Sequence, residues 1–157
     1  MPSAAEGFTV VDGEGRHGGL LRTGAFLATN AGFENSSLIQ RAVSIRRKVL
    51  CQDIPPPGDV VVNGGREDAL AQVFANFTQE QIDALSTREY VELQTSPETC
   101  AQCHLTMINP LGGGLEAYDA IGRSRTTDNG KPVDAAGAWI GVSGIIGFQH
   151  LGNARDL

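Results

Sequence analysis

Cys100-Ala101-Gln102-Cys103-His104 is the stretch of the sequence with the most evident chemistry, and it holds two of the three cysteines and one of the three histidines. Two cysteines with two residues between them and a histidine directly after are typical of covalent c-type haem attachment. The two thiols add to vinyl groups on one edge of the porphyrin, and the neighbouring imidazole binds the iron as the proximal axial ligand. The pattern predicts one covalent haem c, anchored by Cys100 and Cys103 and ligated by His104.

Two other kinds of site use a pair of cysteines at this spacing. A thioredoxin-type dithiol needs a βαβ context, and the sequence around the motif does not show one. A tetrahedral zinc site needs about four ligands. Only Cys51 and the distant His17 and His150 remain to complete one. These requirements favour haem c and leave dithiol chemistry and zinc as alternatives.

The face of the haem opposite His104 would need a second ligand or stay open to small molecules. His150 and His17 are the candidate distal iron ligands, and each has a surface position as its alternative. His150 lies downstream of the motif, the usual direction in small c-type cytochromes. Two histidine ligands would predict a low redox potential. Met107 falls one turn after His104 on the same helix, so we expect it to pack against the haem rather than bind the iron.

The helix that carries the motif is predicted to begin at Ser96. Ser96 is a good N-cap, Pro97 suits the first helical position, and Glu98 suits the positive end of the helix dipole. Such a helix would place the cysteines, the histidine and Met107 on one face, because residues three, four and seven apart share a face.

The region after the motif is predicted to contain a loop, a short helix and a hairpin. Asn109-Pro110 and Gly112-Gly113-Gly114 should end the haem helix. Leu115 to Ile121 should form a short helix that ends at Gly122. The Asp128-Asn129-Gly130 turn should then close a small β-hairpin.

The rest of the chain also has helical patterns. Further helices are expected over 20–29, 38–50, 67–77, 79–85 and 87–93, with capping boxes at 78–81 and 86–89. Arginines of the 38–50 helix, Arg41, Arg46 and Arg47, are expected on a solvated face rather than at haem propionates or a partner. The predicted fold class is mainly α and loop-rich: a small c-type cytochrome-like helical domain with a short β-hairpin after the haem helix.

Length and charge limit the classes of protein further. A chain of 157 residues fits one domain, so we expect an N-terminal arm or linker over 1–17 and a single haem c domain over 18–157. A net charge of −6 argues against nucleic acid and against anionic membrane surfaces as partners. No apolar run approaches the roughly 20 residues of a membrane span.

The sequence also bears on location. Haem c is attached outside the bacterial cytoplasm, which predicts a periplasmic or extracellular protein. The first residues do not read as a signal peptide, so we expect this chain to be a fragment of a larger secreted protein. Cys51, the odd cysteine, is expected to be buried or to pair with a group outside the chain.

Several stretches outside the motif match a pattern shared by other sequences. They are Gly19-Leu20-Leu21 with Ala25–Ala28, Leu50-Cys51 with Ile54–Pro57, Ser96-Pro97, Met107–Gly112, Leu115–Arg123, Arg125–Thr127 and Pro132–Gly137. On these stretches, from Gly18 onward, the sequence resembles the haem-c-bearing domain of unknown function found in large secreted planctomycete-type and myxobacterial cytochrome-like proteins. Gly113-Gly114 depart from that pattern, which often has an aromatic-containing pair there.

The resemblance implies covalent haem c and a place in a multidomain or multigene oxidative system outside the cytoplasm, without a known substrate. Met107, Pro110 and Leu111 are candidate haem contacts. Arg123 and Arg125 follow the loop predicted after the motif and are candidate partners of the haem propionates. Their alternative is a set of salt bridges within the hairpin region.

The sequence therefore predicts electron transfer, with redox partner proteins or neighbouring domains of the parent protein as partners. A haem enzyme is the first alternative: an iron without a protein ligand on its distal face would be open to peroxide or O₂. The second alternative is a haem-stabilised interaction module of a larger assembly. The distal side of the haem decides between carrier and enzyme.

Overall fold

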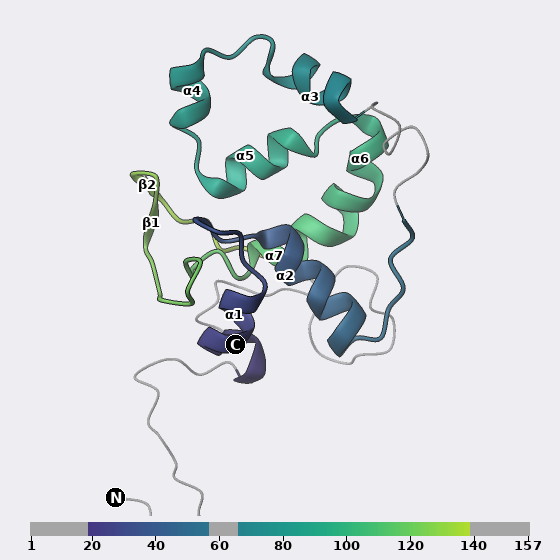
Figure 1. Cartoon of the computed structure of the whole chain (residues 1–157), viewed down its shortest axis with the longest axis vertical. Helices are drawn as coiled ribbons and strands as arrows, with labels where there is room; N and C mark the ends of the chain where they lie inside the picture. The colour runs from purple at the N-terminus through teal and green to yellow at the C-terminus, as the bar shows by residue number, and fades with distance from the viewer. Residues whose placement is uncertain (1–18, 57–65, 139–157) are drawn as a thin grey trace, which may run out of the picture.

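The computed structural model describes residues 19–56 and 66–138. These residues form short helices and loops with one two-stranded antiparallel hairpin, so the predicted mainly α, loop-rich fold is confirmed (Figure 1). The predicted N-terminal arm, His17 and His150 lie outside the described residues.

The described elements follow one another in this order along the chain. The first half holds the 3₁₀-helix η1 (Gly19–Arg22), α1 (Gly24–Thr29), α2 (Leu38–Ser44), the π-helix η2 (Ile45–Val49) and α3 (Arg66–Phe74). The second half holds α4 (Gln79–Asp83), α5 (Thr87–Gln94), α6 (Glu98–Cys103), the π-helix η4 (His104–Ile108), α7 (Asn109–Gly113), β1 (Thr127–Asp128) and β2 (Lys131–Pro132). In Figure 1, α3, α4 and α5 form an arc on one side, α2 crosses α7 on the other, and α6 joins the two groups.

Hydroxyl side chains set the start of the helices before the motif. Thr78 and Ser86 both form complete capping boxes, with Gln81 and Glu89 respectively, as the sequence predicted. Ser37 accepts a hydrogen bond from the Gln40 amide at the start of α2. Each cap satisfies an amide that the first helical turn leaves without a partner.

The start of the motif helix differs from the prediction by one residue. Pro97 is the N-cap of α6 and makes no side-chain cap bond. Ser96 instead donates its hydroxyl to the carbonyl oxygen of Leu93 at 2.8 Å, in the chain that leaves α5. A serine between two helices can hydrogen-bond the last turn of the first helix or the first turn of the second. Ser96 bonds the last turn of α5.

The predicted helix break at Asn109-Pro110 is wrong. The helix runs on from α6 through η4 into α7, as far as Gly113. The register changes in η4, where the Asn109 amide bonds the His104 carbonyl five residues back. Pro110 then falls in the first turn of α7. A proline is tolerated there because that position needs no intrahelical donor.

The predicted helix over Leu115–Ile121 is also wrong. These residues form turns, with a single bridge between Tyr118 and Ser124. The Asp119 carboxylate accepts the amides of Ile121 at 3.0 Å and Arg123 at 2.8 Å, which closes the turn locally. An aspartate that bonds the backbone ahead of it competes with helix formation.

The apolar core lies between α1, α2 and the helix that continues the motif. Its buried members are Leu27, Ala42, Ile45, Ile108, Leu111, Leu115 and Tyr118. α2 and α7 approach so closely that a Cβ at Gly112 would overlap the backbone of Leu38. Gly112 therefore serves close helix packing rather than the loop that the sequence suggested.

The hairpin forms as predicted and is fastened to α5. Thr127 pairs with Pro132 and Asp128 with Lys131, while Asn129 and Gly130 adopt φ values of 50° and 76° at the turn. Left-handed conformations at both turn residues are what an Asn-Gly hairpin requires. The Asp128 carboxylate accepts the amide of Thr87, the first residue of α5, at 2.6 Å.

Candidate functional site

The cysteines and the histidine of the motif occupy the junction between two kinds of helix. Cys100 and Cys103 belong to α6, one turn apart, and His104 is the first residue of η4. All three side chains are half-buried, and neither thiol forms a disulfide. Two free thiols three residues apart on one helix, beside an imidazole, form the donor set that covalent haem attachment needs.

The imidazole of His104 is part of a short hydrogen-bonded chain. Its Nδ1 lies 3.3 Å from Oδ1 of Asn109, and Nδ2 of Asn109 donates to Oγ1 of Thr95 at 2.8 Å. The Thr95 hydroxyl in turn donates to the Val91 carbonyl in α5 at 2.6 Å. Asn109 and Thr95 are 5% and 4% exposed, so this chain connects the motif histidine to α5 through the interior.

Sequence reasoning missed Asn109 as a functional candidate. The sequence predicts a helix break at Asn109, because an Asn-Pro pair usually ends a helix. A residue five positions after a histidine also lies about 140° around an α-helix and would not face it. Only the π-helical register of η4 brings the two together. The sequence signal that could have identified Asn109 is a polar residue within the apolar run of Ile108, Leu111 and Leu115.

Met107, Pro110 and Leu111 are placed around the core. Leu111 is 1% exposed within the apolar cluster, and Met107 and Cys103 pack against that cluster. Pro110 is half-buried, and its carbonyl accepts the amide of Ala138 at 2.9 Å. Haem contact by Met107, Pro110 and Leu111 stays a prediction.

Arg125 is held in ion pairs, the alternative that the sequence left open. Its Nη2 lies 2.8 Å from Glu116 and its Nη1 2.6 Å from Asp128. Nη2 also donates to the Ser36 hydroxyl at 2.9 Å. Burial raises the pKa of Glu116, and the charge of Arg125 opposes that rise. Arg125 thus compensates a carboxylate that is only 2% exposed.

Arg123 is different, because its side chain is 73% exposed and pairs with Asp119 at 2.7 Å. This exposed pair contributes little to stability. Propionate binding by Arg123 or Arg125 stays a prediction.

The prediction of a solvated face for Arg41 and Arg46 is wrong. Arg41 is fully buried, and it donates to the carbonyls of Leu115 at 3.0 Å and Tyr118 at 2.9 Å. Desolvation by burial lowers the pKa of Arg41 to about 10. Arg46 is 3% exposed and donates to the Met107 carbonyl. Both arginines donate to backbone carbonyls of distant segments, and these hydrogen bonds offset the cost of burying their charge.

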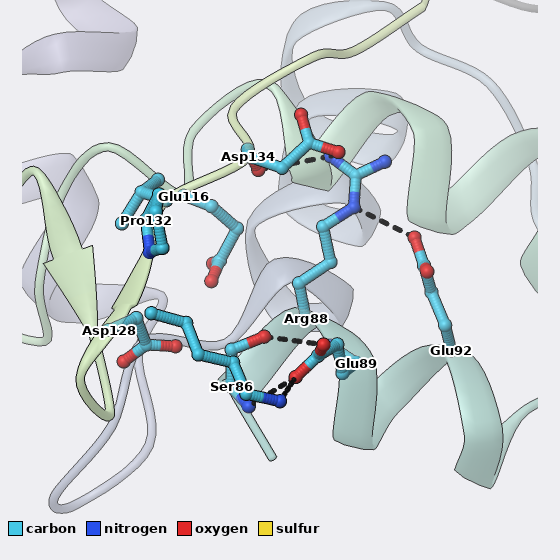
Figure 2. Close-up of a pocket in the computed structure, with 10 residues that line it drawn as sticks. Ser86, Arg88, Glu89, Glu92, Glu116, Asp128, Pro132 and Asp134 are labelled. Carbon is cyan, nitrogen blue, oxygen red and sulfur yellow. Dashed lines mark hydrogen bonds and ion pairs between the residues drawn. The ribbon is translucent and has the colours of Figure 1, made fainter.

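A polar cleft lies between α5 and the hairpin, and Figure 2 shows its charged side chains. Arg88 lies between Glu92, at 2.8 Å, and Asp134, at 3.4 Å. Lys131 of β2 pairs with Glu89 of α5 at 2.5 Å. Because these charges are paired with one another, the cleft fastens the hairpin to α5.

Within residues 19–56 and 66–138, no group of three or more His, Cys, Asp or Glu side chains gathers as a metal site would require. In the same part of the chain, no helix has the length and apolar character needed to cross a membrane.

A mainly helical domain that carries Cys-x-x-Cys-His on a helix has the features of a cytochrome-type domain. Residues 17–128 match the family PSCyt3, which is described as a protein of unknown function (DUF1588). The chain belongs to this family, whose name points to a cytochrome. The matched region contains the motif and ends at Asp128, so residues 132–137 lie beyond it. Neither the curated proteins nor the solved structures contain a significant match.

Proposed function

We propose that this domain binds one haem c covalently and transfers electrons outside the cytoplasm. Cys100 and Cys103 would form the thioether bonds, and His104 would be the proximal iron ligand. The observation that carries the proposal is the donor set itself: two free, half-buried thiols on α6 directly before an imidazole whose Nδ1 contacts Asn109.

An exposed apolar side chain next to the donor set supports the proposal. Leu105, which follows the ligand histidine, is 41% exposed, although it is a large apolar side chain. Exposed apolar surface beside a binding site is the kind of surface that a bound apolar group covers. The thiols of Cys100 and Cys103 are half-buried and not enclosed in the apolar core.

When bound, the haem supplies a one-electron Fe(III)/Fe(II) couple. The role of the protein is to hold the proximal imidazole, to exclude water from the proximal side of the haem, and to set the charge around the ligand. Ile108, Asn109 and Leu111, four to seven residues after the ligand, are buried and exclude water from that segment. We further propose that the electron partners are other redox proteins or neighbouring domains of a larger periplasmic or extracellular protein.

The distal ligand separates this proposal from a haem enzyme. Of the three histidines, only His104 belongs to the described residues. A distal histidine would therefore come from His17 or His150, and this assignment stays a prediction.

The test is haem attachment in the full chain, produced with an export signal in a bacterium that has a cytochrome c maturation system. A pyridine haemochrome assay and intact mass should give one covalent haem per chain. Replacing Cys100 and Cys103 by alanine should abolish covalent haem, whereas Cys51→Ala, an exposed free cysteine, should keep it. A wild-type chain that carries zinc or an internal disulfide but no haem would overturn the proposal in favour of the alternatives.

A further inference from the structure

We propose that Asn109 is the positioning residue for the proximal histidine. Its side-chain oxygen accepts the Nδ1 hydrogen of His104, which sets Nε2 as the nitrogen that binds iron and keeps the ligand imidazole neutral. This inference rests on the proposed function and names the residue that controls the same site.

The first step is the orientation of the Asn109 amide. The Thr95 hydroxyl has one hydrogen, and it is donated to the Val91 carbonyl at 2.6 Å. The remaining lone pairs of that hydroxyl can only accept, so the group facing it at 2.8 Å must be the NH₂ of Asn109. The amide oxygen then faces His104. The neighbouring hydrogen bonds determine this orientation, which is the proper basis for assigning amide groups.

The second step is the tautomer of the imidazole. An amide oxygen accepts hydrogen bonds and cannot donate them, so Nδ1 of His104 must carry the hydrogen. In a neutral imidazole the lone pair is then on Nε2, the nitrogen that would bind a metal. The separation of 3.3 Å is longer than the usual value of about 2.9–3.0 Å. A weak bond of this length orients the ring while adding little to the electron density of the imidazole.

The third step is the helix register. The backbone N–H of Asn109 also donates to the backbone carbonyl of His104. The two residues are therefore joined through both the backbone and the side chains. Residue i+5 lies over residue i only in a π-helix, and π-helical turns occur frequently at functional sites. Arg46 binds the Met107 carbonyl in the middle of this turn, with its Nε at 2.9 Å and its Nη2 at 2.7 Å. The wide turn thus has its own support from η2.

The fourth step is the charge of the acceptor. A histidine ligand becomes more basic when its second nitrogen donates to a strong acceptor such as a carboxylate. A more basic ligand stabilises Fe(III) and lowers the redox potential. The buried amide of Asn109 is neutral, so it orients His104 without adding a negative charge beside it. Asparagine should therefore set a higher potential than aspartate would at the same position.

The test uses the haem-loaded full chain and two substitutions at this position. Asn109→Asp should lower the midpoint potential and raise the Fe–His stretching frequency of the ferrous form in resonance Raman spectra. Asn109→Leu should shift both quantities in the opposite direction. Asn35→Asp adds the same charge at an exposed position outside the site and serves as the matched control.

Potentials and stretching frequencies equal to wild type in both Asn109 variants, at one haem per chain, would overturn this inference and leave the proposed function intact. A wild-type chain without covalent haem would instead overturn the proposed function. If the variants fail to fold, the haem-loaded wild type still gives the answer by NMR. The His104 Nδ1 hydrogen should exchange slowly with D₂O because it is donated to a buried amide, and rapid exchange would contradict the inference.

Discussion

Arg46 donates two hydrogen bonds to the carbonyl oxygen of Met107, from Nε at 2.9 Å and from Nη2 at 2.7 Å. Its third nitrogen donates to Gln52 Oε1 at 2.6 Å. Arg46 belongs to the π-helix η2 and Met107 to the π-helix η4. One irregular helical turn therefore supports another, and the supported turn is the one that begins with the motif histidine.

Arg46→Met should destabilise the domain, because it removes both donors from the Met107 carbonyl and retains most of the apolar volume of the side chain. Leaving a buried acceptor without a partner costs about 1–3 kcal/mol. Urea denaturation of the haem-loaded chain would measure the loss. Lys48→Met, an exposed residue of the same π-helix, is the matched control and should change the stability little. Equal stability of the two variants would mean that Arg46 does not support η4.

Arg125→Met should have a larger effect, because it leaves the carboxylate of Glu116 buried without its cation. Removing one partner of a buried ion pair typically costs about 3–5 kcal/mol. Adding Glu116→Gln to this variant should recover part of the loss, since the uncompensated charge disappears while the volume remains. A double-mutant cycle by urea denaturation measures the coupling. Strictly additive losses would show that the pair does not act as a unit.

Much of this framework was predictable because its signals are local. The capping boxes at Thr78 and Ser86 each lie within four residues, and the Asn129-Gly130 turn determines its hairpin alone. Cys100 and Cys103 were identified by the same kind of short-range spacing, although the haem itself stays a proposal. Features set by neighbouring residues can be read from the sequence because they need no tertiary information.

The remaining features depend on distant parts of the chain. Arg41 and Arg46 were assigned to a solvated face because the carbonyls they bind come from residues that lie far ahead in the sequence. The helix continues through Pro110 because the π-helical turn before it gives proline a first-turn position. The Asn109–His104 contact follows from the same turn. No local pattern in the sequence specifies a π-helical turn, so these features required the structure.

The pH dependence of stability should report the link between α5 and the hairpin. The hydrogen bond from Lys131, followed by the one from the Ser86 amide, holds the pKa of Glu89 below its usual 4.5. Because the folded-state pKa is lower than the unfolded one, ionised Glu89 stabilises the fold above that pH. This contribution disappears as the pH falls through the folded-state pKa.

Glu89→Gln should therefore lower the melting temperature at neutral pH, and the difference from wild type should shrink as the pH falls below 4.5. Thermal melts followed by circular dichroism over this pH range would measure it. Glu34→Gln, at an exposed position in the loop before α2, is the control and should show no such pH dependence. A difference that stays constant across the range would contradict the role given to the Lys131–Glu89 pair.

The distal ligand decides whether the proposed haem acts as an electron carrier or as a catalyst, and it can be tested directly. If His150 binds the sixth position, His150→Ala should convert a low-spin ferric spectrum to a high-spin one and open the iron to cyanide; His17→Ala tests the other candidate in the same way. Only one of the two variants should change, because one axial position remains once His104 is bound.

Two outcomes of that experiment would alter the functional conclusion. A low-spin spectrum that persists in both variants would exclude histidine as the distal ligand. A wild-type spectrum that is already high-spin, with rapid peroxide binding, would favour a haem enzyme over a carrier. In a haem enzyme, Asn109 beside His104 would also affect the reaction rate, because activation of bound peroxide benefits from a more basic proximal ligand. Asn109→Asp should then raise the rate of peroxide reduction, whereas in a carrier it should change only the potential.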